Sequence, residues 1–266
     1  MIAQDTVVLW NRPEAPGYFR IGLACSGFEL AKPGQFIMVR IGSQVDPLLR
    51  RPFSLLGLIR EQDRVIGIEI LFRVVGKGTD RLSRFKKGDR LSVIGPLGNA
   101  FQVPATCRQL VLVAGGIGVP PIRFLAQTLL DRDDRFNRCL VFIGGRSKED
   151  LVCITEFDLP GFLLDISTDD GSQGNPGVVT RSLEKSLDGG PVDLICACGP
   201  RGMLKAVAAI AMRRQIPCQV SIEAMMACGM GACLGCAVAV TDDEARYRHV
   251  CVDGPVFDAH RLKWDF

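Results

Sequence analysis

The sequence predicts a mixed β and α/β fold, in which an N-terminal antiparallel β-barrel precedes a parallel sheet with helices on both faces. A small cysteine-rich module follows at the C-terminus. Short β-rich segments occupy the region before Pro104, and apolar strands alternate with helical patterns after it. Four cysteines gather near the end of the chain. The predicted domains are residues 1–104, 105–218 and 219–266.

The barrel is predicted from closely spaced β segments. β-branched and other apolar residues dominate residues 35–41, 54–59 and 65–75. Turn signals separate such segments, namely KPG at 32–34, KKGD at 86–89 and GPLGN at 95–99. Short strands with turns at this spacing are typical of a small antiparallel barrel.

The pattern of the middle region differs. Continuous apolar runs predict buried strands, and the segments between several of them have helical periodicity. Strands that alternate with helices indicate a parallel sheet covered on both faces. The predicted strands are residues 110–114, 139–143, 163–167 and 193–197, and the predicted helices are 122–130, 179–187 and 203–214.

Composition excludes several classes of protein. The chain has 266 residues, 47% of them hydrophobic, and a net charge of +3, which is typical of a globular protein and not of a nucleic-acid binder. The N-terminus lacks the pattern of a secretory signal, and the apolar stretch 222–240 contains Glu223 and many glycines, so we expect a ligand loop and no membrane span. These features predict a soluble, cytoplasmic protein.

Eleven cysteines, an odd number without a secretory signal, argue against a disulfide framework. Seven of them are scattered along the chain. Because free cysteine is among the most buried residue types, we expect these seven to be small core residues. They are Cys25, Cys107, Cys139, Cys153, Cys196, Cys198 and Cys218.

The other four cysteines have the spacing of a plant-type 2Fe–2S site. Cys228, Cys233 and Cys236 follow the pattern C-x4-C-x2-C, and Cys251 comes after 14 further residues. Glycine and alanine fill the loop, so that backbone N–H groups can approach the sulfur atoms. A zinc site is the alternative, but zinc ligands usually come in pairs and often include histidine. We expect His249, two residues before Cys251, to be a surface residue.

Two motifs in the barrel region indicate a flavin site. Arg51–Ser54 (RPFS) is similar to the Arg-x-Tyr-Ser/Thr motif of the ferredoxin-reductase superfamily, with phenylalanine in place of tyrosine. In such a motif the arginine pairs with a phosphate, the ring packs on the isoalloxazine and the hydroxyl bonds near N5. GKGT at 76–79 offers backbone donors to a pyrophosphate. Taken singly, RPFS is a weak signal that an ordinary strand could also give, and GKGT could also be a surface turn.

Two motifs of the middle region indicate a dinucleotide site. GGIGVP at 115–120 follows a predicted strand and precedes a helix, which is the context that a phosphate-binding loop requires. It departs from GxGxxG and matches the GGxGxxP version of the ferredoxin-reductase superfamily. Cys198-Gly199-Pro200 follows the last predicted strand. The choice between NAD and NADP stays open, since the turn at 146–148 (RSK) is either a 2′-phosphate site or a solvated turn.

The order of these motifs over the whole chain resembles the electron transfer subunits of class 1B dihydroorotate dehydrogenase. CGMGAC and CVDGPVF, which contain cluster cysteines, are the most specific part. The resemblance implies FAD contacts at Arg51–Ser54, Leu71–Arg73 and Gly78–Thr79, and places Cys198 near the reactive carbon of the nicotinamide. The implied cofactor residues are Arg51, Pro52, Phe53, Ser54, Leu71, Phe72, Arg73, Gly78, Thr79, Gly115, Gly116, Gly118, Cys198, Gly199 and Pro200, with Cys228, Cys233, Cys236 and Cys251 as metal ligands.

The resemblance also implies a partner, an FMN-containing catalytic subunit, in a heterotetramer with two copies of each chain that serves pyrimidine biosynthesis. The catalytic base for dihydroorotate is then not on this chain. Nicotinamide accepts two electrons as a hydride and the cluster carries one at a time, so FAD has to connect them. The expected electron path runs from the partner's FMN through the 2Fe–2S cluster and FAD to NAD.

Two other functions remain open at this point. One is the small subunit of an NAD(P)-linked ferredoxin oxidoreductase or hydrogenase, a related family that typically has Asp at the position of Cys228. The other is a non-catalytic zinc-binding interaction module, which would bind no flavin. The ordered flavin motifs disfavour the second alternative.

Overall fold

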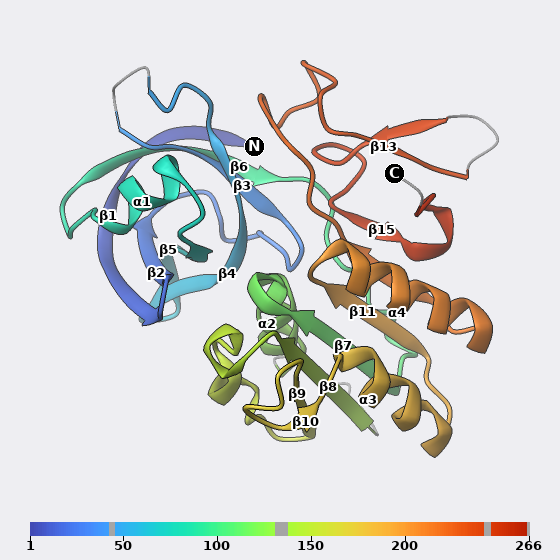
Figure 1. Ribbon diagram of the computed structural model, residues 1–266. Coiled ribbons are helices and arrows are strands. Elements are labelled where there is room, and N and C mark those ends of the chain that lie inside the picture. The colour runs from blue at the N-terminus through green and yellow to red at the C-terminus, as the bar shows by residue number, and fades with distance from the viewer. Residues whose placement is uncertain (43–45, 131–137, 242–245, 265–266) are drawn as a thin grey trace.

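The N-terminal part of the chain forms a closed antiparallel barrel in a computed structural model, which describes residues 1–42, 46–130, 138–241 and 246–264 (Figure 1). The first strand pairs with both the second and the sixth, which closes the barrel. A short helix, α1 (Lys77–Ser83), connects the last two strands. The strands are β1 (Ile2–Ala15), β2 (Tyr18–Ala24), β3 (Phe36–Arg40), β4 (Arg51–Glu61), β5 (Arg64–Arg73) and β6 (Arg90–Leu97).

The predicted barrel is confirmed, but the expectation of short strands is wrong for β1. This strand is 14 residues long, and its pairing with β2 is interrupted by irregularities at Val8/Trp10 and Pro13/Ala15. Such bulges bend a strand, so that one long strand serves two neighbours. Alternate residues fill the interior, with Ile21, Ile37 and Ile70 fully buried there.

The second part is a mainly parallel sheet, as the alternating pattern predicts. Its order is β10-β9-β8-β7-β11-β12-β15. The chain adds β8, β9 and β10 on one side of β7 and then crosses to add β11 on the other side, so the strand order reverses between β7 and β11. Among the strands of this sheet that the structure describes, β15, at one edge, runs antiparallel to its neighbour and the others pair in parallel. The strands are β7 (Gln109–Gly115), β8 (Arg138–Gly145), β9 (Phe162–Thr168), β10 (Asn175–Pro176), β11 (Leu194–Cys198), β12 (Cys218–Ser221) and β15 (Val256–Asp258).

Helices cover both faces of this sheet (Figure 1). Leu110 and Leu112 of β7 face α2 (Val119–Leu130), while Val111 and Val113 face α3 (Val179–Ser186) and α4 (Arg201–Arg214). This division follows from the alternation of side chains along a strand. All seven scattered cysteines are buried, as expected. None of the helices in the described ranges has the length and apolar character of a membrane span.

The C-terminal segment is joined to both larger parts. After β12 the chain forms the cysteine loop and a small hairpin, and β15 then returns to pair with β12. The barrel end is tied to the same segment, because the backbone N–H of Asn99 donates to the Gly254 carbonyl over 2.6 Å. The hairpin strands are β13 (Ala237–Ala239) and β14 (Tyr247–His249), and the 3-10 turns of the chain are η1 (Gly116–Gly118), η2 (Lys148–Asp150), η3 (Ile154–Phe157), η4 (Leu187–Gly189) and η5 (Ala259–Arg261).

Candidate functional site

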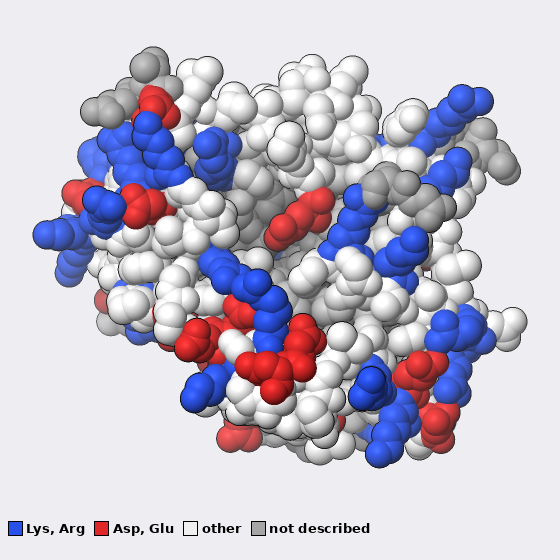
Figure 2. Space-filling model, viewed as in Figure 1, with Lys and Arg blue, Asp and Glu red and all other residues white. Residues whose placement is uncertain are grey.

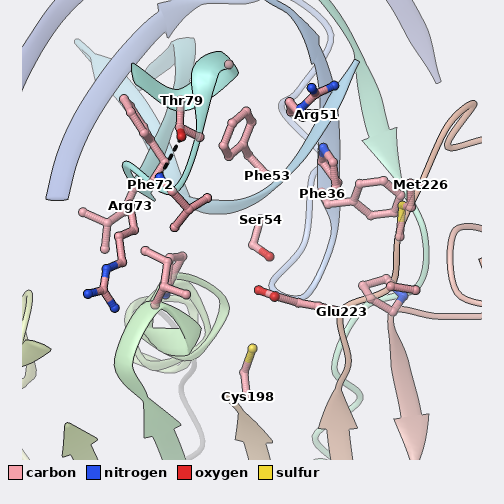
Figure 3. Close-up of a pocket in the computed structure, with 18 of the residues that line it drawn as sticks. Phe36, Arg51, Phe53, Ser54, Phe72, Arg73, Thr79, Cys198, Glu223 and Met226 are labelled. Atoms are coloured by element: carbon pink, nitrogen blue, oxygen red, sulfur yellow. Dashed lines mark hydrogen bonds between the residues drawn. The ribbon is translucent and has the colours of Figure 1, made fainter. Parts of the chain in front are cut away.

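A cavity of about 410 Å³, called here the central cavity, opens between the barrel, η1 and the segment that follows β12. It brings together every residue that the sequence analysis assigns to FAD, from β4, β5 and α1, and it also includes Cys198 at the end of β11. Figure 3 shows Phe53 and Ser54 on its barrel side and Cys198 on the opposite side. The walls are mainly apolar, as ligand cavities usually are.

Arg51 and the turn before α1 form the upper end of this cavity (Figure 3). A Cβ atom on Gly78 would lie 3.4 Å from the Arg51 Nε, so the guanidinium lies close to the backbone of this turn. Thr79 organises the turn by accepting a hydrogen bond from the N–H of Val75 over 2.9 Å. A guanidinium beside a turn with backbone N–H groups is a suitable place for a phosphate.

Aromatic rings line the barrel side of the cavity. The ring of Phe53 makes an edge contact with that of Phe72, with ring centroids 5.9 Å apart. Phe72 in turn stacks on Phe19, with ring centroids 5.8 Å apart. Phenylalanine at position 53 therefore keeps the ring of the flavin motif in a fixed place without the hydroxyl. Across the cavity, Phe36 and Met226 form a second apolar wall (Figure 3). A flat aromatic ligand fits between such walls.

Glu223 is a site residue that the sequence analysis did not identify as one. Its carboxylate points into the central cavity between Ser54 and Cys198 (Figure 3). Glu223 is open to the solvent that fills the cavity, but the surrounding walls partly desolvate its carboxylate, which raises the pKa of Glu223. Burial, with the nearby charge of Glu223 as a second cause, also raises the pKa of Cys198 to about 12, so the thiol stays protonated. The sequence did not indicate a role for Glu223, because only the fold brings it to Cys198.

The glycine loops of the sheet meet at the carboxyl ends of β7 and β11. A Cβ on Gly118 would lie 2.4 Å from the Cys198 carbonyl oxygen and 2.6 Å from the Gly199 Cα, so glycine is required for this contact. The meeting point lies where strand order reverses, which is where open α/β sheets bind nucleotides. Pro120 lies in the first turn of α2, where proline is tolerated.

Two further cavities open beside these loops. Gly115, Gly116 and Pro200 line a cavity of about 570 Å³, called here the nucleotide crevice, at the ends of β7 and β8. Gly118, Gly199 and Pro200 line another of about 540 Å³ beside the C-terminal segment. The residues that the sequence assigns to NAD thus form a continuous edge, called here the glycine edge, from the nucleotide crevice to Cys198.

The four clustered cysteines lie together in the C-terminal segment. Cys236 and Cys251 are buried, with sulfur atoms 3.2 Å apart, while Cys233 is exposed. The loop wraps around the thiols through left-handed turns at Gly229 and Gly231. Glycine is needed there because L side chains rarely adopt positive φ.

Backbone N–H groups point at these sulfur atoms. The Cys228 sulfur accepts hydrogen bonds from the N–H groups of Met230 and Cys233, each over 3.4 Å, and the Cys251 sulfur accepts one from Gly231 over 3.2 Å. The donor at Met230 is the main cause that lowers the pKa of Cys228 to about 6, whereas burial raises the pKa of Cys251 to about 12. Four thiols with inward N–H donors fit an iron–sulfur cluster.

His249 stays outside this group of thiols. Its backbone N–H donates to the Asp253 carboxylate over 2.6 Å, and its Nδ1 lies 3.9 Å from the same carboxylate. The half-buried imidazole thus lies near an acidic neighbour, and four cysteines remain as the candidate ligands.

Family models match two regions of the chain. Residues 112–209 match the oxidoreductase NAD-binding domain, and residues 223–263 match the iron–sulfur cluster binding domain of dihydroorotate dehydrogenase B. The second region contains Glu223 and all four clustered cysteines.

Relatives of known name share most of the chain. A dihydroorotate dehydrogenase B (NAD(+)) electron transfer subunit from Desulforamulus reducens is 38% identical over 89% of this chain and 88% of the relative. The solved structure of an NADH-dependent reduced ferredoxin–NADP oxidoreductase, studied for flavin-based electron bifurcation, is 29% identical and aligns with a TM-score of 0.84 over 98% of this chain and 90% of that chain. A ferredoxin NADP+ reductase from Neisseria gonorrhoeae, solved with FAD and NADP bound, shares the fold at 15% identity, with a TM-score of 0.63 over 79% of this chain and 91% of that chain.

Proposed function

The chain belongs to the family of dihydroorotate dehydrogenase B electron transfer subunits, and from this premise we propose how its residues carry electrons between a catalytic subunit and NAD. The reaction served is the oxidation of dihydroorotate in pyrimidine biosynthesis. The substrate reacts on the catalytic subunit, and this chain supplies the sites for FAD, a 2Fe–2S cluster and NAD. When bound, FAD exchanges both single electrons and hydride, which links a one-electron carrier to nicotinamide.

One observation carries this proposal: the cysteine loop and the central cavity share a wall. Glu223 and Met226 line the central cavity, and Cys228 follows two residues later. The loop also packs on the barrel, since a Cβ on Gly229 would lie 2.4 Å from Met38 Cγ. A cofactor held by the cysteines is therefore adjacent to one held in the central cavity.

We assign the cofactors to residues as follows. FAD occupies the central cavity, with its phosphates at Arg51 and α1 and its ring between Phe53 and Met226. NAD lies along the glycine edge and presents its nicotinamide to Cys198. Cys228, Cys233, Cys236 and Cys251 hold the 2Fe–2S cluster.

The Arg51→Ala variant should retain FAD less tightly than the wild-type protein. The substitution removes a charge-assisted bond to a phosphate, so FAD binding weakens by about 1.5–3 kcal/mol, or roughly tenfold to a hundredfold. Fluorescence titration of the apoprotein with FAD measures the change. Arg60→Ala at the other end of β4 is the matched control, since Arg60 is exposed and outside the central cavity. Equal FAD affinity in both variants would contradict the role of Arg51.

The metal assignment has a direct chemical test. Protein purified without oxygen from iron-replete cells should contain FAD and equal amounts of iron and acid-labile sulfide, corresponding to one 2Fe–2S cluster per chain. It should oxidise NADH with artificial dyes but leave dihydroorotate unchanged when no catalytic subunit is present. Stoichiometric zinc without iron would show that the cluster assignment is wrong.

The partner's docking surface is proposed from exposed apolar residues around the cysteine loop. Met225, Met230, Leu234 and Val252 are exposed, Met225 by 89%, and Cys233 lies among them in the sequence. Figure 2 shows a largely uncharged surface over the segment between β12 and β13. Exposed apolar patches next to a redox centre suit a protein partner that has to approach it. We propose that the FMN-containing subunit docks here and that two copies of each chain form the complex.

A further inference from the structure

Charged side chains of both signs line the nucleotide crevice. Asp150 and Asp169 provide the negative charges, and Arg73 and Arg146 provide the positive ones. An acidic side chain next to the adenosine ribose hydrogen-bonds the 2′-hydroxyl of NAD, whereas an arginine there accommodates the 2′-phosphate of NADP. Whether this crevice prefers NAD or NADP therefore depends on which charge faces the adenosine ribose.

Arg146 pairs with a buried carboxylate of the protein, although its own side chain is 71% exposed. Arg146 directly follows β8, and its Nε donates to the Asp150 carboxylate over 3.1 Å. The hydroxyl of Tyr18, from the barrel, donates to the same carboxylate over 2.7 Å. Arg73 lies 3.4 Å from it as well, and Figure 3 shows Arg73 pointing away from Phe53. A buried carboxylate fixed by the barrel is thus shared between Arg73 and the Nε of Arg146.

Asp169 comes from the neighbouring strand end. Thr168, the last residue of β9, pairs with Gly145, and the N–H of Asp169 donates to the Gly145 carbonyl over 3.0 Å. The next residue has another role, because the Asp170 carboxylate accepts the N–H of Ser172 over 2.9 Å within the turn. Of these two consecutive aspartates, Asp169 is the one that lines the nucleotide crevice, which Arg146 lines as well.

We propose that Asp169 makes the crevice select NAD over NADP, an inference that rests on the dinucleotide site proposed above. Its carboxylate accepts hydrogen bonds from the ribose hydroxyls of NAD. The 2′-phosphate of NADP would place a second negative charge against this carboxylate, and like-charge contacts of this kind exclude the wrong ligand. Asp150 adds a second carboxylate to the same crevice, where it contacts Arg73 and the Nε of Arg146.

Asp169→Asn tests the inference in the full chain with FAD bound. The amide keeps the size of the side chain and removes its charge, so the ratio of kcat/KM for NADH to that for NADPH in dye reduction should fall by about tenfold, equivalent to about 1.4 kcal/mol. The ratio of the affinity for ADP to the affinity for 2′,5′-ADP, measured by calorimetry, should also fall. This measurement does not involve the flavin. Asp169→Ser is a second variant in case the amide disturbs the turn.

Asp158→Asn is the matched control, because Asp158 is exposed and lies outside the nucleotide crevice. It removes the same charge and should leave both ratios at the wild-type values. Unchanged ratios in both Asp169 variants would overturn the role of Asp169 and leave the proposed function intact. A wild-type protein that oxidises neither nucleotide would instead overturn the proposed function, and this inference with it.

Discussion

Cys233→Ser is expected to abolish NAD reduction coupled to dihydroorotate in the assembled complex, while NADH-dependent dye reduction by the same variant stays near the wild-type rate. Serine is a poor substitute for a thiolate ligand, so the cluster is lost or impaired. Hydride exchange between NADH and FAD needs only the central cavity and the glycine edge, and Cys233 lines neither. Steady-state assays with dihydroorotate and with a dye measure the two activities separately.

Ala232→Ser provides the control for the cysteine variant. It places a hydroxyl at the adjacent exposed position of the same loop and keeps all four thiols. We expect both of its activities to match those of the wild-type protein. Full coupling in a Cys233→Ser protein that lacks iron would refute the assignment of the cysteine loop to electron transfer.

Glu69→Ala is expected to cause the largest loss of stability, about 3–5 kcal/mol in the free energy of unfolding. Glu69 accepts hydrogen bonds from Arg20 over 2.5 and 2.7 Å and lies 3.7 Å from Arg123 of α2. Arg123 also contacts Glu156 over 2.6 Å, and the side chains of both arginines are only 9% exposed. Without Glu69, two buried guanidinium groups would share one remaining carboxylate.

This network joins the barrel strands β2 and β5 to α2 and η3 of the sheet domain. Urea unfolding followed by circular dichroism measures the effect, with FAD at a fixed saturating concentration because bound ligand adds to apparent stability. Glu184→Ala is the matched control, since Glu184 pairs with Arg213 over 2.6 Å on the surface, where both side chains are about half exposed. It should cost less than about 1 kcal/mol. Similar losses in the two variants would show that the buried network does not stabilise the domain contact.

Local patterns predicted the parts of the fold that depend on local physics. The alternation of apolar strands and helices gave the parallel sheet, because buried strands and amphipathic helices differ in period. The spacing of Cys228, Cys233 and Cys236 indicated a metal loop, since three ligands lie on one short segment. The length of β1 was not predicted, because its bulges and its pairing with two neighbours depend on the closed barrel.

The residues that the sequence did not identify act through contacts between distant segments. Glu223 faces Ser54 and Cys198 only because β12 and β11 end at the same edge of the sheet. Asp169 likewise comes to the nucleotide crevice, which Arg146 also lines, through the pairing of β9 with β8. Such neighbours have no fixed spacing along the chain, so composition and motif patterns give no signal for them.

Rapid mixing of the assembled complex with dihydroorotate and NAD tests the central claim most directly. Absorbance changes of the cluster and of NADH can be followed in the same reaction, with Cys233→Ser in parallel. The account predicts that cluster reduction precedes NADH formation in the wild-type complex, and that the isolated chain gives neither signal with dihydroorotate. Turnover of dihydroorotate by the isolated chain, or NADH formation at the full rate in a complex without the cluster, would contradict it.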